Sequence, residues 1–213
     1  MTLAPELERA ALSDLPSSVS SVAIPLPHES GRFEPGSLAD WHDWLAEHHA
    51  DTPGIWLVTP RKRPPGTDLT YEESVREALC WGWIDGQVKT LDETRNLQRW
   101  ARRNPRSGWS RTNQVRVAEL EPTGRIQPAG WAVIEAAKAS GMWTLFDDAE
   151  NLVEAPALTV ALDAVPAART AWDSFPPSVR KNALGMIALA KLPETKAKRI
   201  AAIVDKASRG ERP

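Results

Sequence analysis

The sequence is short of the residues that build disulfide frameworks and metal clusters. Cys80 is the single cysteine, so the chain cannot form an internal disulfide or a zinc site made from several cysteines. The four histidines all lie within the first 49 residues, and the rest of the chain therefore has no histidine for a metal site or a catalytic triad. The chain also lacks the Walker A, G-x-G-x-x-G and H-E-x-x-H motifs. We therefore expect no bound metal and no cofactor.

Long apolar stretches are missing as well. No run of residues approaches the roughly 18 apolar positions that a membrane-spanning helix needs. The first residues lack the basic start and unbroken apolar stretch of a secretory signal. Together with the lone cysteine, this predicts a cytoplasmic protein with a mobile tail at residues 1–31. Apolar residues make up 42% of the chain and charged residues 25%, a composition typical of a folded chain rather than of a disordered or membrane protein.

Capping and turn signals predict mixed secondary structure in the first part of the ordered chain. Ser37, Thr70 and Ser110 are expected helix N-caps, the second in a capping box with Glu73. The predicted helices cover residues 37–49, 70–82, 110–120 and 128–141. The predicted strands cover residues 55–59, 83–89 and 91–100, with a turn at Asp85-Gly86.

Prolines divide the remainder into helices alone, predicted at residues 159–162, 167–175, 178–191 and 194–208. The predicted fold class is therefore α+β, a small sheet with packed helices over residues 32–150, followed by an all-helical C-terminal module over residues 151–213.

Four motifs carry a family resemblance. They are ALCWGWIDG at residues 78–86, SGWSRTN at 107–113, GRIQPAG at 124–130 and AKLPETKAKRI at 190–200. In this order they resemble the ALCFGWIDG, S-x-W-S-x-x-N, GRMTPAG and AKRPETRAKRI motifs of the YdeI/OmpD-associated family of bacteriocin-protection proteins. The resemblance covers roughly residues 33–210. It implies a bacterial protein linked to bacteriocin or envelope-stress tolerance, and it implies no established reaction.

A run of arginines is the strongest chemical feature of the sequence. Residues 94–118 contain no acidic residue and seven arginines, which are Arg95, Arg99, Arg102, Arg103, Arg106, Arg111 and Arg116. Guanidinium groups bind phosphate and carboxylate, and indoles such as Trp109 stack on rings and cations. A helix that begins at Ser110 would add amide groups that favour anions. The alternative is a solvated basic face paired with the acidic N-terminal part of the chain, in which these arginines bridge to residues such as Asp40, Asp43 or Glu47.

The segment around Asp85 has two interpretations. In the first, Trp81 and Trp83 form the floor of a cleft, and Asp85 faces a ligand or an arginine as an orienting ion-pair partner. In the second, the two indoles seal a helix–strand junction and Asp85 accepts backbone amides in an Asx-turn. Cys80 lies in an apolar helical pattern, where a free cysteine is usually a small buried hydrophobic residue.

These features lead to three functional hypotheses. The first is a non-enzymatic binding protein that holds an anionic small molecule or nucleic acid in a cleft between the two parts of the chain. Its candidate ligand-binding residues are Trp81, Trp83, Asp85, Arg99, Arg103, Arg106, Trp109, Ser110 and Asn113. The second is an enzyme acting on an acidic small molecule with Asp85 as its polar centre, although no base–nucleophile pair, and hence no catalytic residue, is predicted. The third is a protein that binds a partner through its last C-terminal helix. For the loop at residues 102–110, dense in arginine, we expect mobility until an anion binds.

Overall fold

The computed structural model describes residues 31–62 and 65–213. The predicted tail at residues 1–31 lies outside the described residues, apart from Gly31. Within the described ranges, no helix is long and apolar enough to cross a membrane.

A four-stranded mixed sheet forms the centre of the first part. Its strands are β1 (Arg32–Phe33), β2 (Gly54–Pro60), β3 (Trp83–Thr90) and β4 (Arg95–Arg102). They lie in the order β1-β2-β4-β3, with β1 parallel to β2 and the other pairs antiparallel. The predicted strands are confirmed, but the turn at Asp85-Gly86 is wrong. The strand continues through these residues, and the register shifts between Asp85 and Val88 in a bulge.

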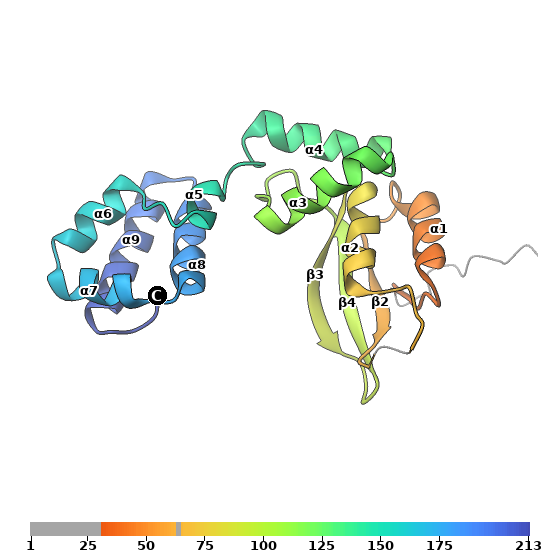
Figure 1. Ribbon diagram of the computed structural model, residues 1–213, viewed down its shortest axis with the longest axis horizontal. Helices are drawn as coiled ribbons and strands as arrows, with labels where there is room; N and C mark the ends of the chain where they lie inside the picture. Colours follow the sequence, from red (N-terminus) through yellow and green to blue (C-terminus); the bar gives the residue numbers. More distant parts are fainter. Residues whose placement is uncertain (1–30, 63–64) are drawn as a thin grey trace, which may run out of the picture.

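Four helices accompany the sheet: α1 (Leu38–His48), α2 (Tyr71–Cys80), α3 (Arg111–Leu120) and α4 (Pro128–Ser140). A short 3-10 turn, η1 (Glu121–Thr123), follows α3. Figure 1 shows α1 and α2 on one side of the sheet. Ser37 caps α1 in a reciprocal capping box with Asp40. The Thr70 hydroxyl accepts a hydrogen bond from the Glu73 amide, as predicted. The predicted reciprocal bond from the Thr70 amide to the Glu73 carboxylate is wrong, because that amide donates to the carbonyl of Asp68.

Tryptophan dominates the core between these helices and the sheet. Trp41 and Trp44 on α1 stack with ring centres 5.4 Å apart, and Trp83 and Trp100 from the strands pack against them. Six of the ten tryptophans are fully buried, and they are Trp41, Trp44, Trp83, Trp100, Trp109 and Trp172. The unusual tryptophan content therefore mainly builds a core, one of the two uses that such large amphipathic rings allow.

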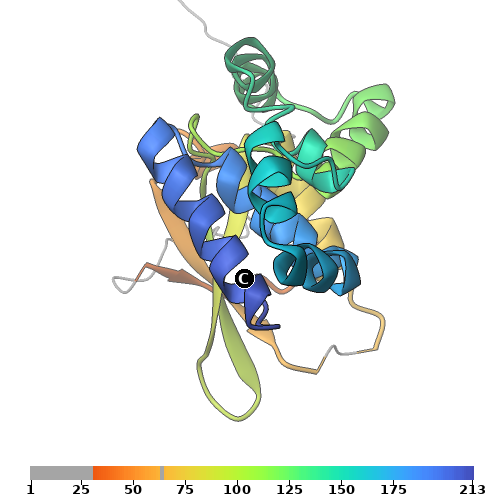
Figure 2. The same cartoon turned by 90° about the vertical axis from the view of Figure 1, so that its left-hand side faces the viewer.

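The C-terminal part is helical, as predicted. Its helices are α5 (Asp147–Glu150), α6 (Pro156–Asp163), α7 (Pro166–Ser174), α8 (Pro177–Ala188) and α9 (Pro193–Ser208). Proline occupies the first turn of α6 to α9, where a missing amide hydrogen has no effect on the helix. Figure 2 shows this group of helices from its own side, with α9 along its front, and α9 contacts α6, α7 and α8.

Two separate apolar clusters form the interior. The first joins α1 to α4 with the sheet, and the second joins α5 to α9 around Leu158, Trp172 and Ile203. The α+β fold followed by a run of helices is thus confirmed. The exact boundary at residue 150 stays a prediction.

Candidate functional site

The junction between α2 and β3 buries both indoles of the predicted cleft floor to different extents. Gly82 has a φ of +75°, a left-handed conformation that glycine adopts easily and that reverses the chain here. Trp83 is fully buried and donates its ring N–H to the carbonyl of His49 over 3.2 Å. Trp81 is half-buried and donates to Glu77 over 3.0 Å. Both ring N–H groups therefore already have partners inside the protein.

Asp85 accepts a side-chain hydrogen bond rather than backbone amides. The hydroxyl of Tyr71, at the start of α2, donates to Oδ2 of Asp85 over 2.8 Å. In the described part of the chain no backbone amide donates to this carboxylate, so the predicted Asx-turn is wrong. Burial, and then the hydrogen bond and charge of Asp85, raise the pKa of Tyr71 to about 12. Tyr71 is therefore a neutral hydrogen-bond donor at physiological pH and not a base.

Arg103 is the most unusual residue of the region. It is 7% exposed, and its guanidinium carbon lies 3.8 Å from the centre of the Trp109 ring. Nη2 donates to the carbonyl of Gly108 over 2.7 Å, whereas Nε is buried without a partner. No carboxylate within the described ranges forms an ion pair with it. Burial lowers the pKa of Arg103 to about 10, and the charge of Asp85 opposes this shift. The group is still charged at neutral pH.

The start of α3 lies directly after Trp109. The Ser110 side chain accepts the amide of Asn113, and Asn113 in turn accepts a 2.8 Å hydrogen bond from Arg116. Arg116 also forms an ion pair with Glu72 at 2.5 Å. The amides of Arg111 and Thr112 form no hydrogen bond among the described interactions. They are first-turn amides of the kind that bind anions.

The structure thus brings five predicted residues into one region: Asp85, Arg103, Trp109, Ser110 and Asn113. It adds Tyr71 and Arg116, and we call this set the Arg103 site. Arg116 belongs to the acid-free arginine run and could have been included from that signal. Tyr71 had no sequence signal beyond being the only tyrosine, because its contact with Asp85 joins the start of α2 to β3 and is visible only in the folded chain.

The other predicted residues lie elsewhere. Trp81 and Trp83 lie on the α2–β3 junction. Arg99 projects from the opposite face of the sheet, where its guanidinium carbon lies 5.8 Å from the centre of the Trp56 ring. Arg106 is exposed in the loop before α3, and its side chain has no described partner. Trp109 is buried between Arg103 and Trp143, so protein groups already contact its ring.

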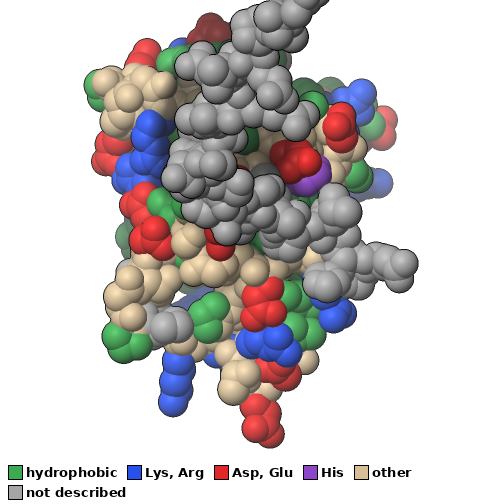
Figure 3. Space-filling model, turned by 90° about the vertical axis from the view of Figure 1, so that its right-hand side faces the viewer, with side chains coloured by type: hydrophobic (Ala, Val, Ile, Leu, Met, Phe, Trp, Pro, Cys, Tyr) green, Lys and Arg blue, Asp and Glu red, His purple; other side chains and the backbone are tan. Residues whose placement is uncertain are grey.

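Two arginines of the run at residues 94–118 form ion pairs with carboxylates. Arg95 pairs with Asp92 and Glu34, and Arg116 pairs with Glu72. Glu34 belongs to the acidic N-terminal part, so one such pair is present, but among the described residues none of these arginines pairs with Asp40, Asp43 or Glu47. Within the described residues, five arginines of the run form no ion pair with a carboxylate: Arg99, Arg102, Arg103, Arg106 and Arg111. On the face shown in Figure 3, acidic and basic side chains are interspersed.

A cleft of about 270 Å³ lies between α5, with Phe146 directly before it, and helix α8. It is lined by Phe146, Glu150, Lys181 and Met186 among others, and its lining includes neither tryptophan nor arginine. This cleft lies within the C-terminal helices and therefore differs from the cleft between the two parts, lined by tryptophan and arginine, that the sequence suggested. Within residues 31–62 and 65–213, no group of three or more histidine, cysteine or acidic side chains is arranged to hold a metal ion.

Two family models match the chain. Residues 33–133 match a domain of unknown function (DUF8412), and residues 152–210 match the Bacteriocin-protection, YdeI or OmpD-Associated family. The second match confirms the predicted family for the C-terminal helices, and it contains the motif at residues 190–200. The first match covers the other three motifs and the Arg103 site. Comparison with curated proteins and with solved structures finds no match.

Proposed function

We propose that this protein binds a small anionic molecule, with a phosphate or carboxylate group, at the Arg103 site and does not transform it. The observation that carries the proposal is the buried Arg103 guanidinium with no carboxylate partner among the described residues. A buried charge is costly unless a counter-charge compensates it. A bound anion would provide that counter-charge.

The surroundings of Arg103 would fix the ligand's orientation. Trp109 and the carbonyl of Gly108 hold the guanidinium in place. Planar guanidinium groups bind phosphate and carboxylate oxygens in a defined geometry. The first-turn amides of α3 supply further donors, and Asp85 would accept a hydrogen bond from a hydroxyl or amino group of the same ligand.

The site favours binding over catalysis because Tyr71 and Arg103 each keep one protonation state at neutral pH. Tyr71 stays neutral, since its pKa is raised to about 12. Arg103 stays charged, and the described residues around Asp85 include no pair of a base and a nucleophile. We also propose a cytoplasmic location, and a link to bacteriocin or envelope-stress tolerance through the C-terminal family.

Tryptophan fluorescence tests the proposal, because Arg103 lies on the Trp109 ring. The wild-type protein would be titrated with inorganic phosphate, nucleotides and short dicarboxylates. We expect saturable, salt-sensitive quenching with at least one of them. The quenching should disappear in Arg103→Gln and persist in Arg106→Gln, which removes an exposed arginine three residues away.

Two controls separate a loss of ligand binding from a loss of folding. Circular dichroism and thermal melting must show that Arg103→Gln is folded, and Arg103→Lys provides a milder variant that keeps the charge. No quenching by any of the anions, or equal loss in the two glutamine variants, would contradict the proposal. The variant Asp85→Asn tests the enzyme hypothesis. If it still binds the anion but loses a turnover that the wild type shows, the protein is an enzyme rather than a binding protein.

A further inference from the structure

The face of the sheet turned away from α1 and α2 carries a row of basic residues around one indole. In the strand register, Arg32 on β1 lies beside Trp56 on β2, and Trp56 lies beside Arg99 on β4. Because side chains alternate along a strand, these three project on the side opposite to the buried Ile55 and Trp100. The helices α1 and α2 pack on that buried side (Figure 1).

A fourth residue, Lys89 on β3, completes the arrangement. Its Nζ lies 4.8 Å from the centre of the Trp56 ring, and the Arg99 guanidinium carbon lies 5.8 Å from it. Gly54 leaves the space that the Arg99 side chain occupies, since a Cβ on Gly54 would lie 2.5 Å from Nη2 of Arg99. We call Arg32, Trp56, Lys89 and Arg99 the Trp56 face.

The charge of the Trp56 face is of one sign. No ion pair joins Arg32, Lys89 or Arg99 to a carboxylate within the described part of the chain. The acidic Glu34, one residue beyond β1, pairs with Arg95 instead. Arg32 and Lys89 are exposed, and Trp56 is half-buried. An accessible indole is thus flanked by basic residues from three strands.

We propose that the Trp56 face binds single-stranded nucleic acid. Proteins that bind single strands combine cations, which contact successive phosphates, with aromatic rings on which bases stack. Lys89 is exposed and flexible, so a base can take its place over Trp56 while its ammonium group moves to a phosphate. An acidic peptide would use the cations but would leave the indole without a role. These residues differ from those of the Arg103 site, so the inference goes beyond the proposed function.

Fluorescence anisotropy with a labelled single-stranded oligonucleotide of about 12 nucleotides, within the site size of single-strand binding folds, tests the proposal on the full chain. A duplex of the same sequence and a polyglutamate peptide serve as competitors. The variants are Trp56→Leu and Lys89→Gln. Trp131→Leu is the matched control, because Trp131 is also partly buried, with Lys138 6.0 Å from its ring centre.

We expect Trp56→Leu to weaken binding about 5- to 100-fold, the usual effect of removing one stacking ring. Lys89→Gln should reduce the slope of log affinity against log salt by about 0.7. Trp131→Leu and Arg103→Gln should bind like the wild type, and duplex and polyglutamate should compete poorly.

The proposal would be overturned by equal binding of duplex and single strand, by full competition by polyglutamate, or by unchanged affinity in a folded Trp56→Leu. If Trp56→Leu does not fold, the exposed Lys89→Gln decides, and an unchanged salt slope overturns the proposal. Loss of oligonucleotide binding in Arg103→Gln alone would place the strand at the other site and would equally overturn it. Failure of the anion titration leaves these measurements unaffected.

Discussion

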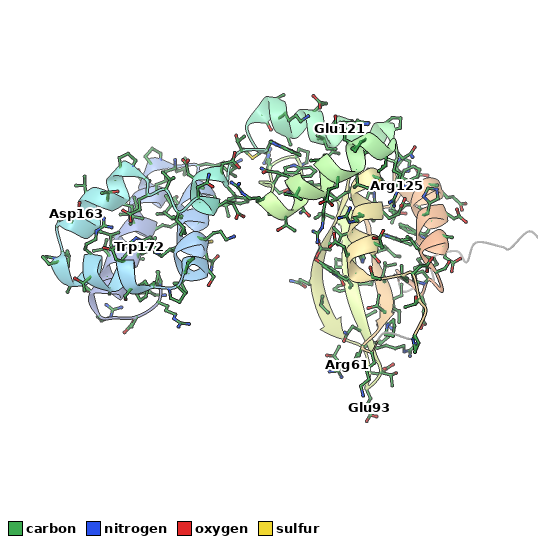
Figure 4. The ribbon with its side chains drawn as sticks, in the orientation of Figure 1. Arg61, Glu93, Glu121, Arg125, Asp163 and Trp172 are labelled. Carbon is green, nitrogen blue, oxygen red and sulfur yellow. The ribbon has the colours of Figure 1, made fainter. Side chains whose placement is uncertain are left out.

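Nη2 of Arg125, in the segment before α4, donates a 2.8 Å hydrogen bond to Oε2 of Glu77, whose side chain is only 6% exposed. The other carboxylate oxygen of Glu77 accepts from Trp81 and lies 2.7 Å from Nδ1 of His42. One buried carboxylate on α2 therefore joins α1, the α2–β3 junction and the chain that leads into α4. Figure 4 labels Arg125 and Glu121, which lie at the same end of the first part of the chain.

This cluster predicts a specific acid sensitivity. Burial alone would raise the pKa of Glu77, but hydrogen bonds from Arg125, His42 and Trp81 outweigh it, and the pKa is lowered from its ordinary value of 4.5. A lowered pKa means that the charged form stabilises the fold above the unfolded-state value, and that this contribution is lost as the pH falls through the folded-state value. Glu77→Gln should cost about 2 kcal/mol at neutral pH and should flatten the acid limb of stability.

Urea unfolding between about pH 3 and 7, the range in which carboxylates titrate, measures the effect. Glu135→Gln is the control, because Glu135 is exposed and, among the described residues, forms an ion pair only with Lys138 on the same helix. It should change stability by no more than about 0.5 kcal/mol. Parallel acid limbs for the wild type and Glu77→Gln would show that the buried carboxylate is not the sensitive group.

The Cys80 thiol should be unreactive toward thiol reagents in the folded protein. Burial, and then the charge of Glu77, raise the pKa of its thiol to about 12, and only the thiolate reacts. Gly130 on α4 adds to this protection, because a Cβ there would lie 2.3 Å from the Cys80 carbonyl oxygen and the backbones are in close contact. A thiol reagent at mildly alkaline pH should label denatured but not native protein. Gly130→Ala should push α4 away from α2 and speed labelling of Cys80. Rapid labelling of the native wild-type protein would contradict the prediction.

Anion binding should slow hydrogen exchange in the loop at residues 102–110. Two backbone hydrogen bonds already hold this loop. The amide of Arg103 donates to the carbonyl of Gly82, and the amide of Trp109 donates to the carbonyl of Met142. We expect phosphate to increase the protection of the remaining loop amides, because a ligand that binds the folded arrangement around Arg103 stabilises it against local opening. The change should be absent in Arg103→Gln and present in Arg106→Gln. Equal protection of the wild type with and without phosphate would mean that the loop is ordered without a ligand.

Local signals predicted most of the secondary structure correctly. Ser37, Thr70 and Ser110 cap their helices, and Pro128 occupies the first turn of α4. Each of these features depends on a few neighbouring residues. Strand β1 has only two residues, too few for a periodic pattern, and its pairing with β2 is visible only in the folded chain.

The arrangement of the candidate site could not be predicted in the same way. Arg99 and Arg103 are four residues apart, yet β4 places Arg99 on one face of the sheet and the chain after β4 turns Arg103 onto Trp109. Asp85 meets Tyr71 only because α2 packs against β3 in the folded chain. The face of the sheet on which a side chain lies depends on how the strands pair, and this pairing joins residues far apart in the sequence. A cluster of arginines in the sequence therefore does not specify one site.

The last prediction concerns α9, the predicted docking helix. Ile200, Ile203 and Ala207 on this helix are buried in the second apolar cluster with Trp172. Part of its remaining apolar surface borders a groove of about 550 Å³ against α6. The helix is therefore a structural part of the C-terminal module.

Truncation after residue 192 should unfold the second cluster and leave the first intact, because the two clusters share no buried residue. Proton–nitrogen correlation spectra should then keep the dispersed indole signals of Trp41, Trp44 and Trp83 and lose that of Trp172. In the full chain, Ile203→Ala should cost about 2–4 kcal/mol. Val160→Ala, at a residue 71% exposed, should cost less than about 0.5 kcal/mol. A truncated chain that keeps the native Trp172 signal would show that α9 is dispensable for the module and free to serve as a docking element.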